Sequence, residues 1–319
     1  MLQWLGRKKR VEGTVGLSLT SQRLSLAHVV RQREETSLLA SHHEELGDVG
    51  VAERLASVVA EHGLQGASTN LVLTPNDYSI YLVEAPQVGD DEMASAIRWK
   101  IKDLLDMPVE DAIIDVMRLP DNAFSGRKQM IYAVASARSR LEERIAQISM
   151  SGLELNSIDI PEMVLRNVVR QFGDDTNGLA FISLRENGST MNITRQGQLY
   201  LTRRINTSVG PDALLEPDWE MRRDRVVLEI QRSLDYFESQ MGQNPVSQIM
   251  IAPRGQDTES MMNSLADALA SPVGVLDYDS ELELDGLPGD DGRSGGQAGR
   301  DLIMAVGAAL RVDGGEASA

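Results

Sequence analysis

Two stretches of the chain, residues 15–39 and 179–205, follow the same pattern and constrain the fold more than any other feature. Each begins with a short apolar run, at 15–19 and at 179–184, and continues through a small polar turn into a second, alternating run. Alternation with a period of two around a turn of Gly, Asn or Ser predicts a β-hairpin. Two such hairpins about 165 residues apart indicate a duplicated α/β core, with one hairpin opening each half.

In a core of this kind the two predicted hairpin turns, at residues 20–23 and 185–189, would face each other across a cleft. Their backbone N–H groups could then hold a phosphate, as successive amides do in anion-binding nests. Two unrelated surface hairpins would produce the same pattern, so the repeat alone leaves both interpretations open.

Length and composition narrow the class of protein. A chain of 319 residues exceeds what one compact core usually absorbs, which predicts two lobes. A net charge of −17 disfavours nucleic acid as a partner, and the absence of Cys suits a reducing compartment. The apolar runs are shorter than the roughly 20 residues that a membrane-spanning helix needs, and the N-terminus lacks a signal-peptide core. These features predict a soluble, cytoplasmic protein.

The first ten residues reverse the local charge of this acidic chain. Two apolar residues are followed by four basic ones, in the order Trp4, Leu5, Arg7, Lys8, Lys9 and Arg10. A Trp beside a basic cluster could hold the protein against anionic lipid, with each basic residue adding about 1 kcal/mol near the surface. A solvated terminus without a membrane contact is the alternative.

The most regular stretch, residues 78–160, reads as strand, helix, strand, strand, helix, strand. Its two helical segments, at 92–105 and 140–150, carry apolar residues three and four positions apart. This order is that of a ferredoxin-like split β-α-β unit. It predicts a small α/β domain inserted into a first lobe that spans residues 11–176.

The predicted second lobe spans residues 177–312. Its strongest helical pattern covers 226–241, where apolar side chains recur at three- and four-residue spacing. The segment 279–301 is rich in Gly and Asp with almost nothing to bury, which predicts a mobile loop. A polar tail at 313–319 ends the chain.

No pattern for metal or nucleophilic chemistry stands out. The four histidines, His28, His42, His43 and His62, lack matched carboxylates or thiols, so no metal site is predicted. His42 and His43 are expected in an exposed polar loop, and Asp174 with Asp175 in a solvated linker between the lobes. A G-x-S-x-G elbow, which a serine hydrolase would need, is absent.

Four segments carry a resemblance to a known family. They are IRWKIKDL at 97–104, PVEDA at 108–112, IDIPE at 158–162 and, most specifically, EIQRSLDY at 229–236. They resemble the PilM-type actin-like proteins of type IV pilus assembly, and within that family the members of mannose-sensitive hemagglutinin (MSHA) pilus systems. The resemblance covers most of residues 11–312. It implies a two-lobed actin-like (ASKHA) α/β fold with an inserted domain in the first lobe.

The resemblance also implies nucleotide-binding positions, and here the sequence departs from the family pattern. Ser18 and Thr20 stand where the first hairpin of the family has Asp and Gly, and Ser183 and Arg185 stand there in the second. The Asp serves Mg²⁺ and its waters, and the Gly lets a phosphate approach the backbone. The adenosine-side Gly pair is reduced to Gly255. The candidate positions are Ser18, Thr20, Ser21, Gln22, Ser183, Asn187, Gly188, Ser189, Glu229, Arg232, Ser233 and Gly255.

In relatives, the helix that carries Glu229, Arg232 and Ser233 borders the adenosine. An exposed ion pair between Glu229 and Arg232, three residues apart, is the alternative role for these residues. Because three motifs are eroded, we expect a degenerate actin-like ATPase that hydrolyses no ATP and carries no cofactor. ATP with Mg²⁺ is the alternative ligand.

By resemblance, the chain would be a non-catalytic scaffold at the cytoplasmic face of the inner membrane. It would hold the short cytoplasmic tail of a PilN-like membrane partner in a groove beside the inserted domain, and could meet pilus motor ATPases. The candidate contacts are Arg98, Trp99 and Lys102, which lie off the apolar stripe of the first inserted helix. The alternative for Trp99 is that it packs internally.

Two rival functions remain at this stage. One is an ATP-dependent switch or ATPase of the PilM type. The other is a GspL-like cytoplasmic component of type II secretion, which shares the fold and differs in partner. GspL-like chains continue into a membrane span, whereas this sequence ends at Ala319 after a polar tail, which favours the PilM-like interpretation.

Overall fold

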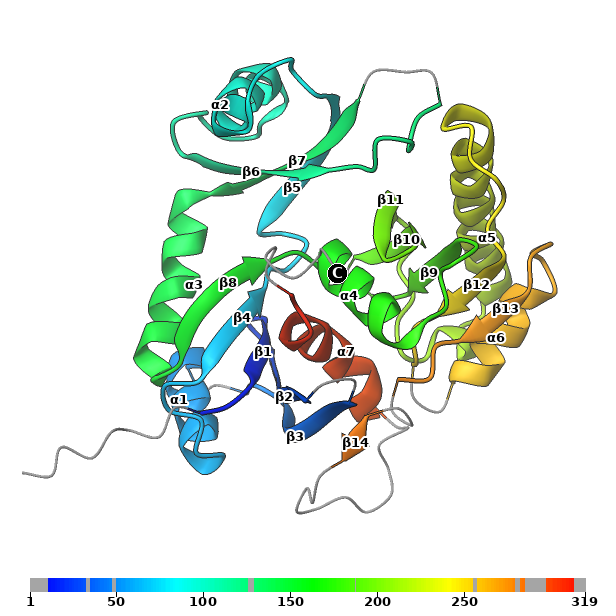
Figure 1. The fold of residues 1–319 in the computed structure, drawn as a ribbon. Helices are drawn as coiled ribbons and strands as arrows, with labels where there is room; N and C mark the ends of the chain where they lie inside the picture. Colours follow the sequence, from blue (N-terminus) through cyan, green and yellow to red (C-terminus); the bar gives the residue numbers. More distant parts are fainter. Residues whose placement is uncertain are drawn as a thin grey trace, which may run out of the picture.

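The structure, a computed structural model, describes residues 11–32, 35–47, 50–125, 129–186, 188–254, 257–278, 282–284 and 297–312. The strands of these ranges form three sheets, of six, five and three strands (Figure 1). The larger two belong to the two lobes, and the smallest belongs to the inserted segment.

The first lobe is built on the six-stranded sheet, in the order β14-β3-β2-β1-β4-β8. Its strands are β1 (Thr14–Leu19), β2 (Arg23–Gln32), β3 (Glu35–Glu45), β4 (Ser68–Val72), β8 (Glu154–Asp159) and β14 (Glu283–Leu284). β1, β2 and β3 are antiparallel neighbours, whereas β4 runs parallel to both β1 and β8. The first predicted hairpin is therefore confirmed.

The second lobe repeats this arrangement in the order β11-β10-β9-β12-β13. Its strands are β9 (Leu179–Ser183), β10 (Ser189–Arg195), β11 (Gln198–Ile205), β12 (Gln248–Ile251) and β13 (Val273–Val275). Again three antiparallel strands are followed by two parallel additions. The match with β3-β2-β1-β4-β8 confirms the predicted duplicated core.

Each hairpin continues into a third strand, β3 or β11, that the sequence pattern did not predict. His42 and His43 lie on β3, so their expected position in an exposed loop is wrong. Both are only partly exposed, and the Nδ1 atom of His43 lies 2.9 Å from the hydroxyl of Ser25 on β2.

Helices cover the sheets and connect them. They are α1 (Val51–Glu61), α2 (Asp90–Ile101), α3 (Arg138–Ser151), α4 (Pro161–Phe172), α5 (Trp219–Asp235), α6 (Thr258–Ala266) and α7 (Gln297–Ala309). Short 3-10 turns, η1 (Lys102–Leu104) and η2 (Ala213–Leu215), follow α2 and precede α5, and a π-helical turn (Tyr236–Gln240) extends α5. α1 and α3 pack together on the first sheet, whereas α5 and α6 pack on the second.

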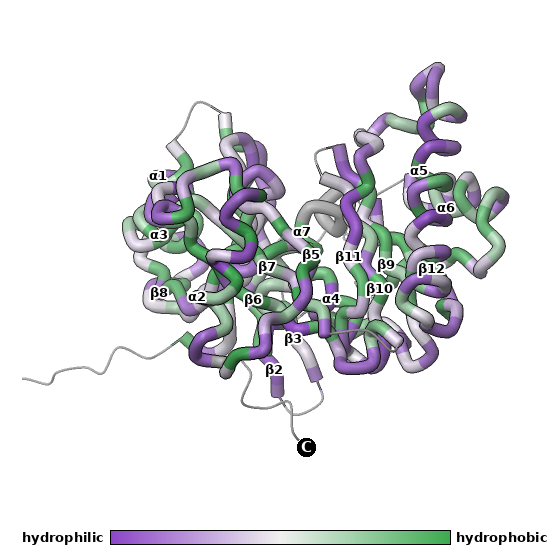
Figure 2. The backbone as a smooth tube through the Cα atoms, turned by 90° about the horizontal axis from the view of Figure 1, so that it is seen from above, coloured by the Kyte–Doolittle hydropathy of each residue, from purple (hydrophilic) through white to green (hydrophobic). Residues whose placement is uncertain are grey.

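Helices α4 and α7 lie between the two lobes (Figure 2). They share one hydrophobic core with β2 of the first sheet and β9 of the second. The contact is close, because a Cβ atom at Gly16 would lie 1.7 Å from the carbonyl oxygen of Ala305 on α7. A Cβ at Gly307 would likewise lie 2.6 Å from the carbonyl of Val164 on α4. Glycine at these two positions is what lets the helices pack directly on the sheet and on each other.

The inserted segment is smaller than predicted. Its sheet has three antiparallel strands in the order β5-β7-β6: β5 (Tyr78–Glu84), β6 (Ala112–Arg118) and β7 (Met130–Ala137). The last predicted strand, β8, pairs with β4 in the first lobe, and Ile148 of α3 is fully buried in the first-lobe core. The four-stranded ferredoxin-like arrangement over residues 78–160 is therefore wrong. Apolar periodicity identifies a strand and a helix, but it does not say which sheet they join.

The inserted segment packs on the second lobe as well as the first. Leu119, Phe124 and Tyr132 lie in the second-lobe core. The Tyr132 hydroxyl accepts a hydrogen bond from the backbone N–H of Thr202 (3.2 Å) and donates one to its carbonyl (3.4 Å), at the free edge of β11. The segment thus bridges the two lobes.

Some predicted segments fall outside the described residues. These are the basic segment 1–10, most of the predicted loop (279–281 and 285–296) and the tail 313–319. Within the predicted loop 279–301, β14 pairs with β3, and α7 begins at Gln297. The prediction of one continuous loop is therefore wrong at these two places.

Candidate functional site

The edge at which β9 and β12 end is the first candidate for a ligand site. The two strands are parallel, with Ile182 opposite Ile251, so their carboxyl ends meet at one edge of the sheet. In open α/β sheets, ligands bind at the carboxyl ends of such strands. Leu184 and Arg254 extend the chain beyond this edge.

A buried arginine occupies the edge. Arg254 is 5% exposed, and its guanidinium donates hydrogen bonds to three backbone carbonyls, those of Leu184, Val209 (3.3 Å) and Gly210 (2.6 Å). Its backbone N–H donates to the hydroxyl of Thr258 at 2.7 Å. A cation with several donors therefore lies where the family pattern has a small Gly. The sequence analysis noted only that one Gly is missing beside Gly255 and did not predict the role of Arg254.

The turn between β1 and β2 uses its own donors. The hydroxyl of Thr20 accepts hydrogen bonds from the N–H groups of Gln22 (3.2 Å) and Arg23 (2.8 Å). The N–H of Thr20 donates to the carbonyl of Arg23 at 2.9 Å. Ser18 lies half-buried near the end of β1, and Ser21 is exposed at the tip. Three backbone N–H groups of the turn that was predicted to hold a phosphate are thus hydrogen-bonded within the turn itself.

The turn between β9 and β10 is closed in a similar way. The buried hydroxyl of Ser189 accepts from the N–H of Arg185 (2.7 Å) and donates to its carbonyl (2.9 Å). The guanidinium Nε of Arg185 donates to the buried hydroxyl of Ser183 at 3.2 Å. Gly188 has φ +88° and lies against the first lobe, since a Cβ there would be 2.5 Å from the Cγ atom of Pro75. Asn187 lies outside the described residues.

The positions on α5 also have structural partners. Glu229 accepts hydrogen bonds from the N–H of Asn206 (2.9 Å) and the hydroxyl of Thr207 (3.0 Å), which fixes the loop after β11. The hydroxyl of Ser233 donates to the carbonyl of Glu229 at 2.7 Å. Arg232 is exposed, and the described residues show no ion pair between it and Glu229, so the alternative role of an ion pair is wrong. Gly255 lies outside the described residues.

One acidic residue lies at the matching edge of the first sheet. Asp159 ends β8, is 7% exposed, and accepts hydrogen bonds from the N–H of Ile160 (2.9 Å) and the guanidinium of Arg311 (3.0 Å). This carboxylate is therefore already neutralised by a residue that follows α7. The described residues contain no group of three His, Asp or Glu side chains placed to hold a metal ion.

A buried carboxyl group links α4 to the start of the inserted segment. Glu162 is 1% exposed and accepts a hydrogen bond from the hydroxyl of Tyr78 at 2.6 Å. Burial raises the pKa of both groups above their ordinary values. The guanidinium of Arg204, from the second lobe, lies 5.0 Å from the centre of the Tyr78 ring and donates to the carbonyl of Pro75 at 3.3 Å. These contacts hold the lobes together.

The predicted partner-binding residues on α2 have different environments. Arg98 donates to the carbonyls of Val109 (2.7 Å) and Ala112 (2.9 Å), so it fixes the connection to β6. Trp99 is 64% exposed, and Lys102 is exposed where η1 begins. The alternative that Trp99 packs internally is wrong. Of the three predicted contacts, Trp99 and Lys102 have side chains that a partner can reach.

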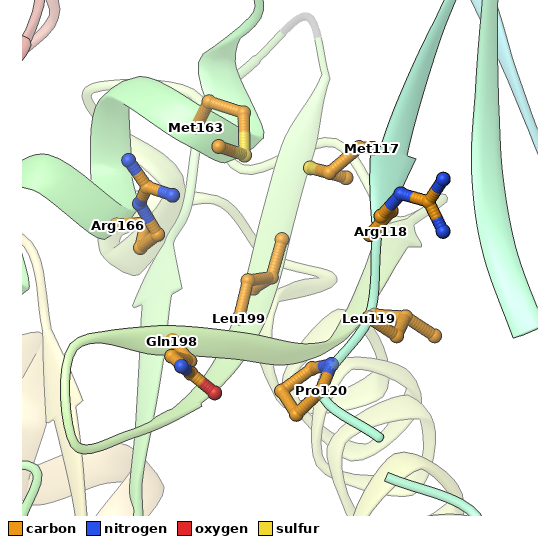
Figure 3. Close-up of a pocket in the computed structure, with 8 residues that line it drawn as sticks. All are labelled: Met117, Arg118, Leu119, Pro120, Met163, Arg166, Gln198 and Leu199. Atoms are coloured by element: carbon orange, nitrogen blue, oxygen red, sulfur yellow. The ribbon is translucent and has the colours of Figure 1, made fainter. Parts of the chain in front are cut away.

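A pocket of about 250 Å³ lies where the end of β6, helix α4 and the start of β11 meet (Figure 3). It is lined by Met117, Arg118, Leu119, Pro120, Met163, Arg166, Gln198 and Leu199. None of these residues belongs to α2, so the pocket and the exposed Trp99 are separate features. The sequence analysis did not predict this site, because its lining comes from three distant segments.

Comparison with known proteins supports the fold. No family model matches the sequence, and no curated protein matches it. The solved structure of a PilM–PilN type IV pilus biogenesis complex is similar with a TM-score of 0.72 and 15% identity, over 95% of this chain and 98% of that one. A Bacteroides thetaiotaomicron protein with an actin-like ATPase fold and unknown function gives 0.51 and 12%, over 89% and 96%. The actin-like α/β fold is thereby confirmed. Across the described ranges, no helix is both long and apolar enough to cross a bilayer.

Proposed function

We propose that this chain is a non-catalytic assembly protein of a type IV pilus inner-membrane platform. The observation that carries the proposal is Arg254, whose buried guanidinium bonds three carbonyls at the edge where an actin-like fold would receive a nucleotide. The self-bonded turns at Thr20 and Ser189 support it, because they leave fewer N–H donors for a phosphate. In this proposal the chain neither hydrolyses ATP nor carries a cofactor.

The partner in this proposal is the cytoplasmic tail of a PilN-like membrane protein. The similar solved structure is described as a PilM–PilN complex, which supports this class of partner. On this chain, the exposed Trp99 and Lys102 of the inserted segment are the proposed contacts. We assign the chain to an MshI-like, MSHA-type system on the sequence segments alone, and place it at the cytoplasmic face of the inner membrane.

Thermal unfolding with and without excess Mg·ATP tests the first half of the proposal. A ligand at 100 times its dissociation constant would add about 2.7 kcal/mol to the free energy of unfolding. We expect no rise in the melting temperature. A clear, saturable rise would instead favour the ATP-dependent switch, and would make Glu229 and Arg232 of α5 the first residues to mutate.

Binding of a synthetic peptide with the sequence of a PilN-like cytoplasmic tail tests the second half. We expect saturable fluorescence anisotropy with the labelled tail and none with a scrambled peptide of the same composition. If instead the tail of a GspL-associated secretion protein bound and the PilN-like tail did not, the chain would belong to the type II secretion alternative. Contacts with pilus motors and, through residues 4–10, with anionic membrane remain predictions from the sequence.

A further inference from the structure

The pocket between β6, α4 and β11 contains an arginine, Arg166, that has no role in the proposed scaffold function. We propose that it binds a carboxylate carried on a branched aliphatic stem, and that the guanidinium of Arg166 receives the carboxylate. The inference is independent of the proposed partner tail, whose contacts lie on α2.

Arg166 lies on α4 and is half-buried. Its Nη2 atom donates to the side-chain oxygen of the neighbouring Asn167 at 2.9 Å, and its buried Nε atom has no hydrogen-bond partner within the described ranges. A guanidinium carries five N–H donors, so a single neutral acceptor leaves most of its capacity unused. Leaving a buried donor without a partner is costly, and a bound acceptor would remove that cost.

The electrostatic surroundings favour an anion. Burial lowers the pKa of Arg166, the nearby cations Arg170 and Arg311 lower it further, and only Asp159 raises it. That carboxylate is already bonded to Arg311 at 3.0 Å. A chain with a net charge of −17 thus keeps a local excess of positive charge around this pocket. A negatively charged ligand would compensate the charge of Arg166, because an uncompensated charge that is shielded from water is unfavourable.

The walls of the pocket define the rest of the ligand. Met117 and Met163 point toward each other above Leu199, whereas the side chain of Arg118 extends away from the cavity (Figure 3). Thioether side chains adapt to the shape of aliphatic groups. One guanidinium can hold a carboxylate by two parallel hydrogen bonds, and the Met and Leu side chains of the lining offer apolar contact to the aliphatic group behind it. The volume of about 250 Å³ suits a short branched chain behind the carboxylate.

The test compares charged and neutral probes of the same shape. Isocaproate and its neutral amide are titrated into the full-length protein containing isotope-labelled arginine, and the guanidinium resonances are followed by NMR. The resonance that disappears in R166Q identifies Arg166. A second pair of blocked peptides, acetyl-Leu-Glu-Leu-amide and acetyl-Leu-Gln-Leu-amide, asks whether the carboxylate can come from a protein side chain.

We expect isocaproate to shift the Arg166 resonance saturably and to bind roughly tenfold or more tightly than its amide, since a charge-assisted hydrogen bond is lost with the amide. R166Q should lose the same factor, R166K should retain part of the affinity, and R225Q, which changes an exposed arginine of α5, should bind as the wild type does. Displacement of isocaproate by the Glu peptide but not by the Gln peptide would identify a protein segment as the source. Displacement by neither peptide would identify a free organic acid.

Equal binding of isocaproate and its amide, unchanged affinity in R166Q, or no saturable shift at millimolar isocaproate would each overturn the proposal. Thermal unfolding of R166Q and R166K checks that both variants are folded. If R166Q does not fold, the affinity of R166K provides the test. A failed Mg·ATP or tail experiment leaves this result untouched, because neither uses the pocket.

Discussion

At the scale of single residues, Arg254 determines what the second-lobe edge can bind. Two of its acceptor carbonyls, those of Leu184 and Val209, are buried, that of Gly210 is partly buried, and all three would lose the guanidinium as a donor if it were removed. We predict that Arg254→Met lowers the free energy of unfolding by about 3 kcal/mol, because buried carbonyls would remain unsatisfied. Urea denaturation measures this difference.

The matched control for this substitution is Arg232→Met, which removes an exposed arginine from α5. Surface substitutions of this kind change stability by about 0.5 kcal/mol or less. If both variants were equally stable, the hydrogen bonds of Arg254 would not stabilise the edge of the second sheet. They would then no longer support the proposed non-catalytic function.

Asp77 gives the fold a specific dependence on pH. It is 5% exposed and accepts hydrogen bonds from the N–H (3.0 Å) and hydroxyl (2.7 Å) of Thr74, and from Arg144 (3.3 Å). Burial by itself would raise the pKa of the carboxyl group, but the hydrogen bonds from Thr74 and the charge of Arg144 hold it below its ordinary value of 3.8. The ionised form therefore stabilises the folded state above that value, and the stability is lost as the pH falls through the lowered pKa.

We predict that Asp77→Asn costs about 2 kcal/mol of unfolding free energy at neutral pH, because it removes the charge that Arg144 and Thr74 hold. The difference between variant and wild type should shrink as the pH falls below 3.8. Urea titrations across this range measure it. A difference that stayed constant with pH would show that the loss of packing, and not of charge, is responsible.

At the scale of elements, the sequence predicted the helices and strands that a local pattern determines. It did not predict which sheet a strand joins, because that depends on tertiary pairing. The two hairpins and the helical pattern at 226–241, which α5 and the π-helical turn cover, follow from alternation, turn residues and apolar spacing. The sheet that β8 joins depends on pairing with β4, which no local signal encodes. The strand β3 was missed because its polar residues, including His42 and His43, follow no clean alternation.

The candidate site was predicted less completely than the fold, for a physical reason. Motif comparison showed that Ser18 and Ser183 stand where the family has Asp, and that one Gly of the adenosine-side pair is missing, but it did not predict which residue lies at the edge of the second sheet. Arg254 lies there, bonded to carbonyls about 45 to 70 positions away in the chain, and such contacts appear only once the fold brings the segments together. The pocket at Arg166 could not be predicted for the same reason, because its lining comes from three segments that are distant in the sequence.

Helix α2 carries a prediction about partner binding. Trp99 is 64% exposed, so its removal should leave the core intact. We predict that Trp99→Ala weakens binding of the PilN-like tail roughly tenfold or more, as loss of an aromatic anchor does, while the unfolding free energy changes by about 0.5 kcal/mol or less. Anisotropy titrations and urea denaturation measure the two quantities.

Met150→Ala provides the control, because Met150 is a 72% exposed apolar side chain on α3. It should leave the affinity for the tail unchanged. Equal loss of affinity in both variants would indicate a non-specific effect of surface hydrophobicity, and an unchanged affinity in Trp99→Ala would remove α2 from the proposed interface.

At the scale of the whole molecule, the two lobes are joined in more places than a simple hinge would need. Helices α4 and α7 share a core with both sheets, and the inserted segment adds a second connection through Phe124 and Tyr132. Actin-like folds that respond to nucleotide must move their lobes, whereas a scaffold benefits from holding them at one angle. The bridge through the inserted segment is therefore consistent with the proposed non-catalytic function.

The hydroxyl of Tyr132 makes one of the polar contacts of this bridge, and a single substitution can remove it. Burial raises the pKa of Tyr132 to about 12, so the hydroxyl keeps its proton at neutral pH. In Tyr132→Phe, the N–H of Thr202 on the free edge of β11 would lose its acceptor at 3.2 Å. We predict roughly tenfold faster hydrogen exchange at the Thr202 amide, the factor that corresponds to one lost hydrogen bond of about 1.4 kcal/mol. The Leu201 amide, next to it on the strand, provides the internal control. Acceleration of both amides would mean that the whole strand had loosened, and no acceleration of either would mean that the ring alone, without its hydroxyl, joins the inserted segment to the second lobe.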